Sequence, residues 1–199
     1  MQANQRILEG LMTTTSADGS ANISPMGPIV DDSMGTLRLR PYRTSTTYAN
    51  LKRRGTGVFH VTDDVLLLAR AAVGAVDPPP ELLPCPAVDE PMLAGACRWY
   101  AVRVRSLDDS QERTEIVVDV VDRGRLRDFF GLNRAKHAVV EAAILATRVE
   151  FLPHEEILAD YERLRVMVEK TGAADEHAAF EFLLNYVQTA TAGSQQQHV

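Results

Sequence analysis

Four hydroxyl side chains stand in a row in the segment RPYRTSTTYANL, with arginines on both sides. The hydroxyl residues are Thr44, Ser45, Thr46 and Thr47, and the arginines are Arg40, Arg43 and Arg54. A phosphate monoester is bound by uncharged donors and backbone N–H groups at a helix N-terminus, where the helix dipole favours negative charge. The arginines add the positive charge that attracts a dianion. The segment therefore predicts a phosphate site, and the alternative is a helix N-cap at Thr44 or Ser45 with the other hydroxyls in solvent.

Several other polar residues in the sequence could be catalytic or bind a metal. His137 and Glu141 stand one helical turn apart, a spacing that suits an acid/base pair, two metal ligands or a solvent-facing ion pair. The segment 154–156, His-Glu-Glu, lacks the HExxH pattern, and we predict no metal site. Cys85 and Cys97 lack the paired spacing of a zinc or redox motif, so we expect reduced thiols without a chemical role. No glycine pattern typical of hydrolases, NTPases or dinucleotide folds is present.

The composition is that of a folded protein with an acidic surface. The chain has 199 residues, 45% of them hydrophobic, and a formal net charge of −6. This length can bury a substantial core, and the negative charge argues against a nucleic-acid partner. No apolar run reaches the roughly 20 residues that span a bilayer, and the start MQANQRILEG lacks the parts of a signal peptide. We therefore expect a cytoplasmic protein with no membrane partner.

Short apolar runs separated by turn residues predict an antiparallel sheet in the first two thirds of the chain. The expected strands are residues 7–15, 21–29, 35–40, 57–62, 98–105 and 114–121. The first two should form a hairpin closed at Asp18-Gly19, and a short helix at 47–53 should follow the hydroxyl cluster. About six antiparallel strands can close into a small barrel.

Between these strands, residues 73–95 are rich in proline, which denies them regular hydrogen-bonded structure, and we expect a long ordered loop or lid. The last third has helical periodicity. Ala138, Ala142, Leu145 and Val149 repeat on one face, as do Ile157, Tyr161, Leu164 and Val168 on a second helix and Phe180, Leu183 and Val187 on a third, at 175–189. Pro153 separates the first two helices and Gly172 ends the second. The polar ending AGSQQQHV should be disordered.

The order of these segments resembles the FMN-binding split-barrel proteins. The strand NISPMG at 22–27, the hydroxyl loop leading to Asn-Leu at 50–51, and the strand GVFHVTDD at 57–64 follow one another as in that superfamily. The segments TYANL and LNRAKHAVVEAAILATR are similar to the DUF447 family, whose members join a split barrel to C-terminal helices. The resemblance covers nearly the whole chain and implies an α+β fold, with an antiparallel split barrel followed by about three helices.

The resemblance also implies which residues bind the cofactor. It assigns Thr44, Ser45, Thr46 and Thr47 to the FMN phosphate, and Asn22, Ser24, Met26 and Gly27 to the isoalloxazine ring or ribityl chain, with His60, Val61 and Thr62 beside the ring. His60 stands where the family pattern has Asn. It is the only imidazole predicted near the ring, and no catalytic residue is assigned.

The implied organisation is a split-barrel domain at 1–125, a helical region at 126–192 packed on the barrel or on a dimer partner, and a disordered tail at 193–199. The implied function is that of an FMN-dependent oxidoreductase or flavin reductase-like protein. It would form a homodimer with FMN at the interface and use a small-molecule electron donor or acceptor. The alternatives are a non-enzymatic FMN-binding or redox-sensing module and a cofactor-free dimeric scaffold with the same barrel.

Overall fold

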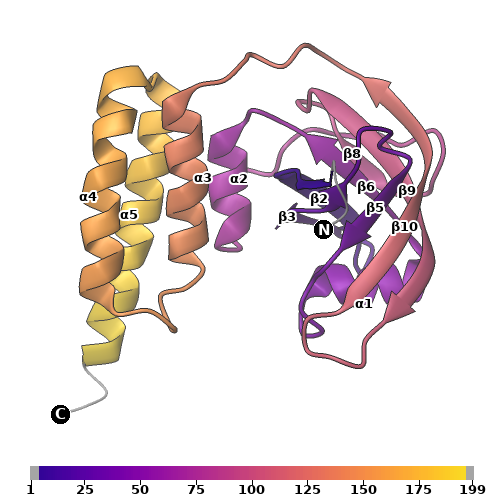
Figure 1. The fold of residues 1–199 in the computed structure, drawn as a ribbon, viewed down its shortest axis with the longest axis horizontal. Helices are drawn as coiled ribbons and strands as arrows, with labels where there is room; N and C mark the ends of the chain where they lie inside the picture. Colours follow the sequence, from indigo (N-terminus) through magenta and orange to yellow (C-terminus); the bar gives the residue numbers. More distant parts are fainter. Residues whose placement is uncertain (1–4, 196–199) are drawn as a thin grey trace. The chain divides into compact units, whose positions relative to one another are not determined.

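The computed structural model describes residues 5–195, which form two compact units. The first unit contains every described residue up to Thr62 together with Pro79–Phe129, and the second contains Asp63–Pro78 and the described residues from Phe130 on. The first is a curled sheet and the second a group of helices (Figure 1). The C-terminal part of the helical unit therefore begins at Phe130 instead of the predicted residue 126, and the unit also includes the earlier segment Asp63–Pro78.

The first unit is built on one antiparallel sheet of eight strands. Across the sheet these are β1 (Arg6–Ile7), β4 (Ile29–Val30), β5 (Thr36–Leu39), β10 (Glu115–Arg125), β9 (Arg98–Asp108), β6 (Thr56–Val61), β2 (Gly10–Thr15) and β3 (Ala21–Met26). The sheet curls into a split barrel with β1 and β3 as its edges (Figure 1). The predicted fold class is confirmed. The sheet has eight strands instead of about six because the predicted strands 7–15 and 21–29 are each interrupted, so that the two-residue strands β1 and β4 are separate from β2 and β3.

Strands β2 and β3 form the predicted hairpin, with its turn at Asp18-Gly19. In its register Met12 lies opposite Ser24, and Thr14 lies opposite Asn22. Residues directly opposite each other on antiparallel strands point to the same face of the sheet. Asn22 and Ser24 therefore share a face with Met12 and Thr14.

The face that carries Met12 holds the main apolar core, and we call it the inner face. Side chains alternate between the two faces along a strand, so Phe59 on β6 and Tyr100 on β9 enter this core while their neighbours do not. The buried members are Met12, Met26, Val30, Leu37, Leu39, Tyr48, Leu51, Phe59, Tyr100, Val102, Ile116 and Val118.

The opposite, outer face of β6 and β9 is covered by residues 79–97, which we call the strap. A second apolar cluster forms there from Val58, Trp99 and Ala101 of the sheet and Cys85, Val88 and Met92 of the strap. The prediction that this segment has no regular structure is wrong, because β7 (Leu82–Pro84) and β8 (Pro91–Leu93) pair as a two-stranded ribbon. Pro84 and Pro91 form the last pair of the ribbon. Proline is tolerated there because its missing N–H removes no hydrogen bond from the middle of the ribbon.

Helix α1 (Thr46–Arg54) links β5 to β6 and confirms the predicted helix at 47–53. Ser45 is its N-cap, since the Ser45 hydroxyl accepts a hydrogen bond from the Tyr48 N–H at 3.2 Å. The helix ends at Gly55, whose φ of 70° is the left-handed conformation that glycine adopts without strain. Tyr48 and Leu51 enter the inner core and fix the helix on the sheet.

The helical unit contains α2 (Val65–Ala72), α3 (Arg134–Ala146), α4 (His154–Thr171) and α5 (Ala174–Gln195). The three predicted C-terminal helices are confirmed, and their predicted core positions Ala142, Tyr161 and Leu183 are fully buried. Helix α5 ends at Gln195, inside the stretch predicted to be disordered, and residues 196–199 lie outside the described residues. None of the helices in the described part is long and apolar enough to cross a membrane.

Helix α2 was not predicted, because Asp63-Asp64 reads as the solvated end of a strand. In the structure the Asp64 carboxylate caps α2 by accepting the Leu67 N–H at 2.9 Å. Asp63 is buried, and its backbone carbonyl accepts a hydrogen bond from Lys136 Nζ at 2.7 Å. The same ammonium pairs with Glu176 at 2.6 Å, which ties α2, α3 and α5 together.

Candidate functional site

The hydroxyl cluster lies at the N-terminus of α1, where its four members have different environments. Ser45 is half-buried and caps the helix, so the N-cap alternative is correct for this residue. Thr44 and Thr46 are exposed beside the first turn, whereas Thr47 is only 3% exposed. The backbone N–H groups in the first turn of a helix have no partner inside the helix. Together with exposed hydroxyls beside them, they can bind an anion.

Thr47 joins the hydroxyl cluster to β3. Its hydroxyl lies 2.6 Å from the Ser24 hydroxyl and accepts a hydrogen bond from Asn22 Nδ2 at 3.0 Å. Two residues predicted at the ring or ribityl chain are therefore brought together with one predicted at the phosphate. The contact forms because Asn22 and Ser24 share the inner face, and α1 lies against that face at the same level as the hairpin turn.

Two further residues, which were not predicted as site residues, complete this network. Asn22 Nδ2 also donates to the Thr14 hydroxyl at 3.2 Å, and Asn50 Nδ2 donates to the same oxygen at 3.0 Å. Thr14 and Asn50 are both buried. Asn50 belongs to the Asn-Leu pair of the family pattern, which was the available signal, whereas Thr14 becomes visible only through the register of β2 and β3. We call Thr14, Asn22, Ser24, Thr47 and Asn50 the polar cluster.

Positive charge is distributed unevenly around α1. Arg43 is exposed just before the cluster, with its Nη1 donating to the backbone carbonyl of Asp109 at 3.3 Å. The Nε of Arg40 is buried and has no hydrogen-bond partner among the described residues. A buried guanidinium donor without an acceptor is costly, so an anionic ligand beside this loop suits Arg40. Lys52 is engaged elsewhere, because its hydrogen bond to the Asp109 carboxylate raises the pKa of Lys52 to about 12.

Arg54 does not join the hydroxyl cluster. It is the last residue of α1, and eight residues of helix place it about 12 Å from Thr46 along the axis. There Arg54 Nε pairs with Glu90 at 2.6 Å and Nη2 pairs with Asp89 at 2.9 Å. The hydrogen bond that Arg54 donates to Glu90 is the main reason that the pKa of Arg54 is raised above its ordinary value. The expectation that Arg54 adds charge at the phosphate is wrong.

Glu90 is the centre of a second polar group at this end of α1. Its carboxylate accepts hydrogen bonds from the Thr15 N–H at 2.7 Å, the Thr15 hydroxyl at 2.7 Å and the Thr56 hydroxyl at 2.8 Å, besides the Arg54 guanidinium. The Glu90 side chain is fully buried. We call Thr15, Arg54, Thr56 and Glu90 the latch, because it fastens the strap to the barrel.

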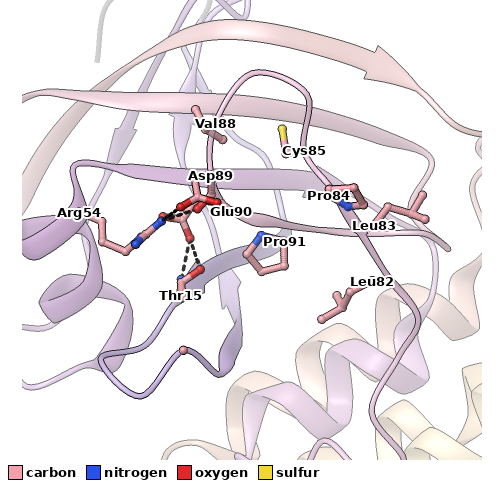
Figure 2. Close-up of a pocket in the computed structure, with 11 residues that line it drawn as sticks. Thr15, Arg54, Leu82, Leu83, Pro84, Cys85, Val88, Asp89, Glu90 and Pro91 are labelled. Carbon is pink, nitrogen blue, oxygen red and sulfur yellow. Dashed lines mark hydrogen bonds and ion pairs between the residues drawn. The ribbon is translucent and has the colours of Figure 1, made fainter.

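A pocket of about 460 Å³ opens beside the latch. Figure 2 shows Arg54, Asp89 and Glu90 at one side of it and Leu82, Leu83 and Pro84 of β7 at the other. The polar groups that line this pocket are hydrogen-bonded to one another and hold the strap in place. Of the residues predicted at the cofactor, only Arg54 lines it, and Arg54 does not reach the hydroxyl cluster.

Strand β3 is an edge strand, paired only with β2. Its outer edge therefore carries backbone N–H and C=O groups that no neighbouring strand of the sheet uses. Met26 is buried in the inner core, so its side chain is not available to a ligand. Gly27 lies just beyond β3, where an added Cβ would be 2.9 Å from Ile7 Cγ2.

His60 does not meet the polar cluster. It alternates with Phe59 on β6, so its side chain points to the outer face, under the strap, and it is fully buried. Its Nε2 accepts the Leu93 N–H at 3.1 Å, while Nδ1 lies 3.3 Å from the Leu11 carbonyl oxygen. The first contact requires an unprotonated Nε2, and burial lowers the pKa of His60 to about 4. His60 is thus a neutral residue that holds β8 on the sheet.

Val61 is the last residue of β6, and Thr62 follows it. Val61 is half-buried against the inner core, and its carbonyl accepts the Cys97 N–H at 2.9 Å. Thr62 is half-buried and is the last residue before the chain first enters the second unit. The structure places neither residue in the polar cluster. His137 and Glu141 are both exposed on α3, and no group of three potential metal ligands occurs among the described residues.

Comparisons with known proteins identify related chains. The family model described as "Protein of unknown function (DUF447) N-terminal domain" matches residues 8–127, and the model "Protein of unknown function (DUF447)" matches residues 133–185. No functionally curated protein matches the chain.

Among solved structures, the chain is similar to an FMN-bound DUF447 protein from Methanosarcina mazei, with a TM-score of 0.75 and 21% identity over 90% of this chain and 94% of that chain. It is also similar to a flavoredoxin from Methanosarcina acetivorans, with a TM-score of 0.51 and 12% identity over 60% of this chain and 68% of that one. A third match is a 2-nitrobenzoate 2-nitroreductase from Pseudomonas fluorescens, with a TM-score of 0.50 and 15% identity over 59% and 64%. These likenesses show the split-barrel fold.

Proposed function

The chain belongs to the DUF447 family, and on that premise we propose that it binds FMN, with the phosphate at the N-terminus of α1 and the flavin along β3. The observation that carries this proposal is the contact of Thr47 with Asn22 and Ser24, which joins a phosphate-type helix N-terminus to an edge strand. The fold likeness to an FMN-bound DUF447 protein supports it.

The residues at the phosphate end fit a dianion. Thr46 and Thr44 offer exposed hydroxyls, the first turn of α1 offers backbone N–H groups, and the helix dipole favours negative charge there. Arg43 and the buried, unpartnered Nε of Arg40 supply positive charge in a protein whose net charge is −6. Thr47 and Ser45 hold this turn in place through their bonds to Ser24 and Tyr48.

The residues along β3 fit a planar ring with an imide edge. The edge of the strand that pairs with no other strand presents backbone N–H and C=O groups, except at Pro25, which has no N–H, and such groups can pair with the donors and acceptors of an imide. The distance along β3 from Asn22 to Met26 is about 13 Å at the usual rise per strand residue, long enough for a ribityl chain and a ring to follow. Asn22 and Ser24 would orient the ribityl chain, and Met26 and Gly27 would contribute backbone groups.

A bound flavin supplies hydride or electron transfer, and we propose that the protein is an FMN-dependent oxidoreductase or flavin reductase-like protein. The chain's own contribution is binding and orientation. The polar cluster contains hydroxyl and amide groups only, and His60, on the outer face of β6, has both ring nitrogens engaged under the strap. We further propose a homodimer that covers the side of the flavin away from β3, because the free edge of that strand gives the ring a neighbour on one side only.

The test is a fluorescence titration with FMN of the wild type and of the double variant Thr46→Ala/Thr47→Ala. Because charge-assisted hydrogen bonds contribute about 1.5–3 kcal/mol, the variant should bind FMN at least tenfold more weakly. The control is Thr36→Ala, which removes a half-buried hydroxyl from β5 and should leave affinity unchanged. Equal affinity in all three proteins would contradict the phosphate assignment.

A second step separates an oxidoreductase from a non-enzymatic flavin module. The FMN-loaded protein is mixed anaerobically with NADH and then NADPH, and the flavin absorbance is followed. Multiple-turnover reduction of an added acceptor supports the enzyme. Tight binding with no turnover supports the module, and failure to retain FMN supports the cofactor-free scaffold.

A further inference from the structure

Two arginines face each other across neighbouring strands at one end of the barrel. In the pairing of β9 with β10, Arg98 lies directly opposite Arg125. Side chains in such positions have Cβ atoms about 5 Å apart. Like charges directly opposite each other destabilise a sheet, so this pair opposes folding unless something else compensates it.

Strand alternation places a third arginine on the same face. Tyr100 enters the inner core and lies opposite Arg123, and Arg98 is two residues from Tyr100 along β9. Arg98, Arg123 and Arg125 therefore all project from the inner face, beyond the end of the apolar core. Arg98 also lies directly opposite Val61 of β6.

In the part of the chain that the structure describes, only one of these three arginines has a carboxylate partner that neutralises its charge. Arg125 pairs with Asp128 at 2.9 Å, and Arg123 Nη1 donates to the Ser33 carbonyl oxygen at 3.1 Å. For Arg98, the described residues provide no hydrogen bond or ion pair to the guanidinium. All three side chains are exposed. The three guanidinium groups and the Asp128 carboxylate together carry a charge of +2, on a chain whose net charge is −6.

We propose that Arg98, Arg123 and Arg125 form a binding site for a small organic anion that carries a phosphate or carboxylate group. Two guanidinium groups side by side offer planar pairs of N–H donors that match the oxygens of either group. A bound anion would remove the repulsion between Arg98 and Arg125. A departure from a local rule of sheet stability is expected where function requires it.

This site is distinct from the proposed FMN phosphate site. Thr47 and Asn22 lie at the end of β2 and β3 that carries the hairpin turn, whereas Arg98 lies opposite Val61 at the other end of β6. The proposal goes beyond FMN binding and names the chemistry of a second ligand, at the end of β6 where the family resemblance places Val61 beside the flavin ring.

The test is calorimetric titration with inorganic phosphate and with citrate at constant ionic strength, together with thermal unfolding in the same buffers. Wild-type protein should bind at least one of the two anions and unfold several degrees higher in its presence, because a ligand of the native state raises stability. Arg98→Gln should weaken that anion at least fivefold. Without anion, Arg98→Gln should unfold at the same temperature as the wild type or higher, a result that a merely structural arginine would not give.

Two controls identify the site. Arg103→Gln removes an exposed arginine from the outer face of the same strand and should bind the anion as the wild type does. Thr46→Ala/Thr47→Ala should also keep the binding, and its loss there would assign the anion to α1 and overturn the proposal. Equal binding by wild type and Arg98→Gln, or no binding of either anion by the wild type, would overturn it as well.

Discussion

The polar groups at the two ends of helix α1 differ in whether their hydrogen-bonding groups have partners within the protein. At the C-terminal end the latch uses Glu90 and Arg54 to satisfy one another and the surrounding hydroxyls, and the Glu90 side chain is fully buried. At the N-terminal end Thr46 is exposed and the Nε of Arg40 has no partner among the described residues. Adjacent residues of β2 serve the two groups, since Thr14 bonds to the polar cluster and Thr15 to the latch.

The difference indicates how to separate a structural polar group from a ligand site in this fold. A buried carboxylate with four donors has nothing left to offer a ligand, and removing it leaves buried partners unsatisfied. At a helix N-terminus, replacing an exposed hydroxyl residue costs little stability. The backbone N–H groups there have no partner inside the helix and can bind a ligand. Variants at the two ends should therefore change different properties, stability at one end and FMN affinity at the other.

The largest expected effect is at the latch. Glu90→Ala should lower the free energy of unfolding by about 3–5 kcal/mol, because it leaves the Arg54 guanidinium and the Thr15 N–H without their acceptor. Urea denaturation measures this change. The matched control is Asp89→Asn, whose fully exposed side chain also contacts Arg54 and should leave the midpoint unchanged.

The latch variant also tests the comparison itself. FMN affinity of Glu90→Ala, measured at a temperature where the variant is folded, should stay within twofold of the wild type. A loss of affinity equal to that of Thr46→Ala/Thr47→Ala, with unchanged stability, would contradict the structural role of the latch.

The next effect is the pH dependence that His60 gives to the strap. The unfolded chain binds a proton at this imidazole with a pKa of about 6.5, whereas burial lowers the pKa of folded His60 to about 4. Between these values the unfolded state binds more protons, so the His60 contribution is complete above pH 6.5 and is lost as the pH falls toward 4. The loss over that window is roughly 3 kcal/mol.

Urea denaturation at pH 7, 5.5 and 4.5 should show this loss in the wild type and a shallower pH dependence in His60→Gln. Gln retains an acceptor for the Leu93 N–H but does not titrate. His137→Gln, at an exposed histidine on α3, serves as the control and should keep the wild-type slope. If the free energy of unfolding depends on pH in the same way in the wild type and in His60→Gln, folded His60 is not held neutral by burial.

The smallest effect on stability, with a clear effect on binding, is expected at Ser45. Ser45→Asp should leave the free energy of unfolding nearly unchanged, because Asp caps a helix as well as Ser does, while the new carboxylate repels the FMN phosphate and weakens binding more than tenfold. Ser45→Ala is the converse control. It should lower stability by about 1 kcal/mol through loss of the cap and change FMN affinity less than Ser45→Asp does. If Ser45→Asp binds FMN as tightly as the wild type, the phosphate does not lie at this turn.

Local patterns were sufficient to predict much of this fold. The hairpin at Asp18-Gly19, the short helix after the hydroxyl cluster and the three C-terminal helices all have signals within a few residues of sequence. Helix α2 has eight residues, VLLLARAA, too few and too uniformly apolar to show a helical period, and its cap reads equally well as a strand end. The pairing of β7 with β8 was hidden by the prolines at its end.

The candidate site was predictable where chemistry is local and not where it depends on tertiary contacts. The row of four hydroxyls predicts an anion site or a cap, but only the packing of α1 on β3 distinguishes buried Thr47 from exposed Thr46. His60 lies in a strand pattern that suggests a place beside a ring. Its position on the outer face follows from alternation with Phe59, and its burial follows from a strap about thirty residues later in the chain.

The central claim is that this barrel binds FMN, and the visible absorption spectrum of the purified protein, taken before and after FMN addition and desalting, tests it most directly. Flavin bands near ~370 and ~450 nm, retained through desalting in proportion to protein, are the result we predict for a cofactor held by the protein. A colourless protein that releases all added FMN would contradict the claim and leave the hydroxyl cluster as the N-cap of α1.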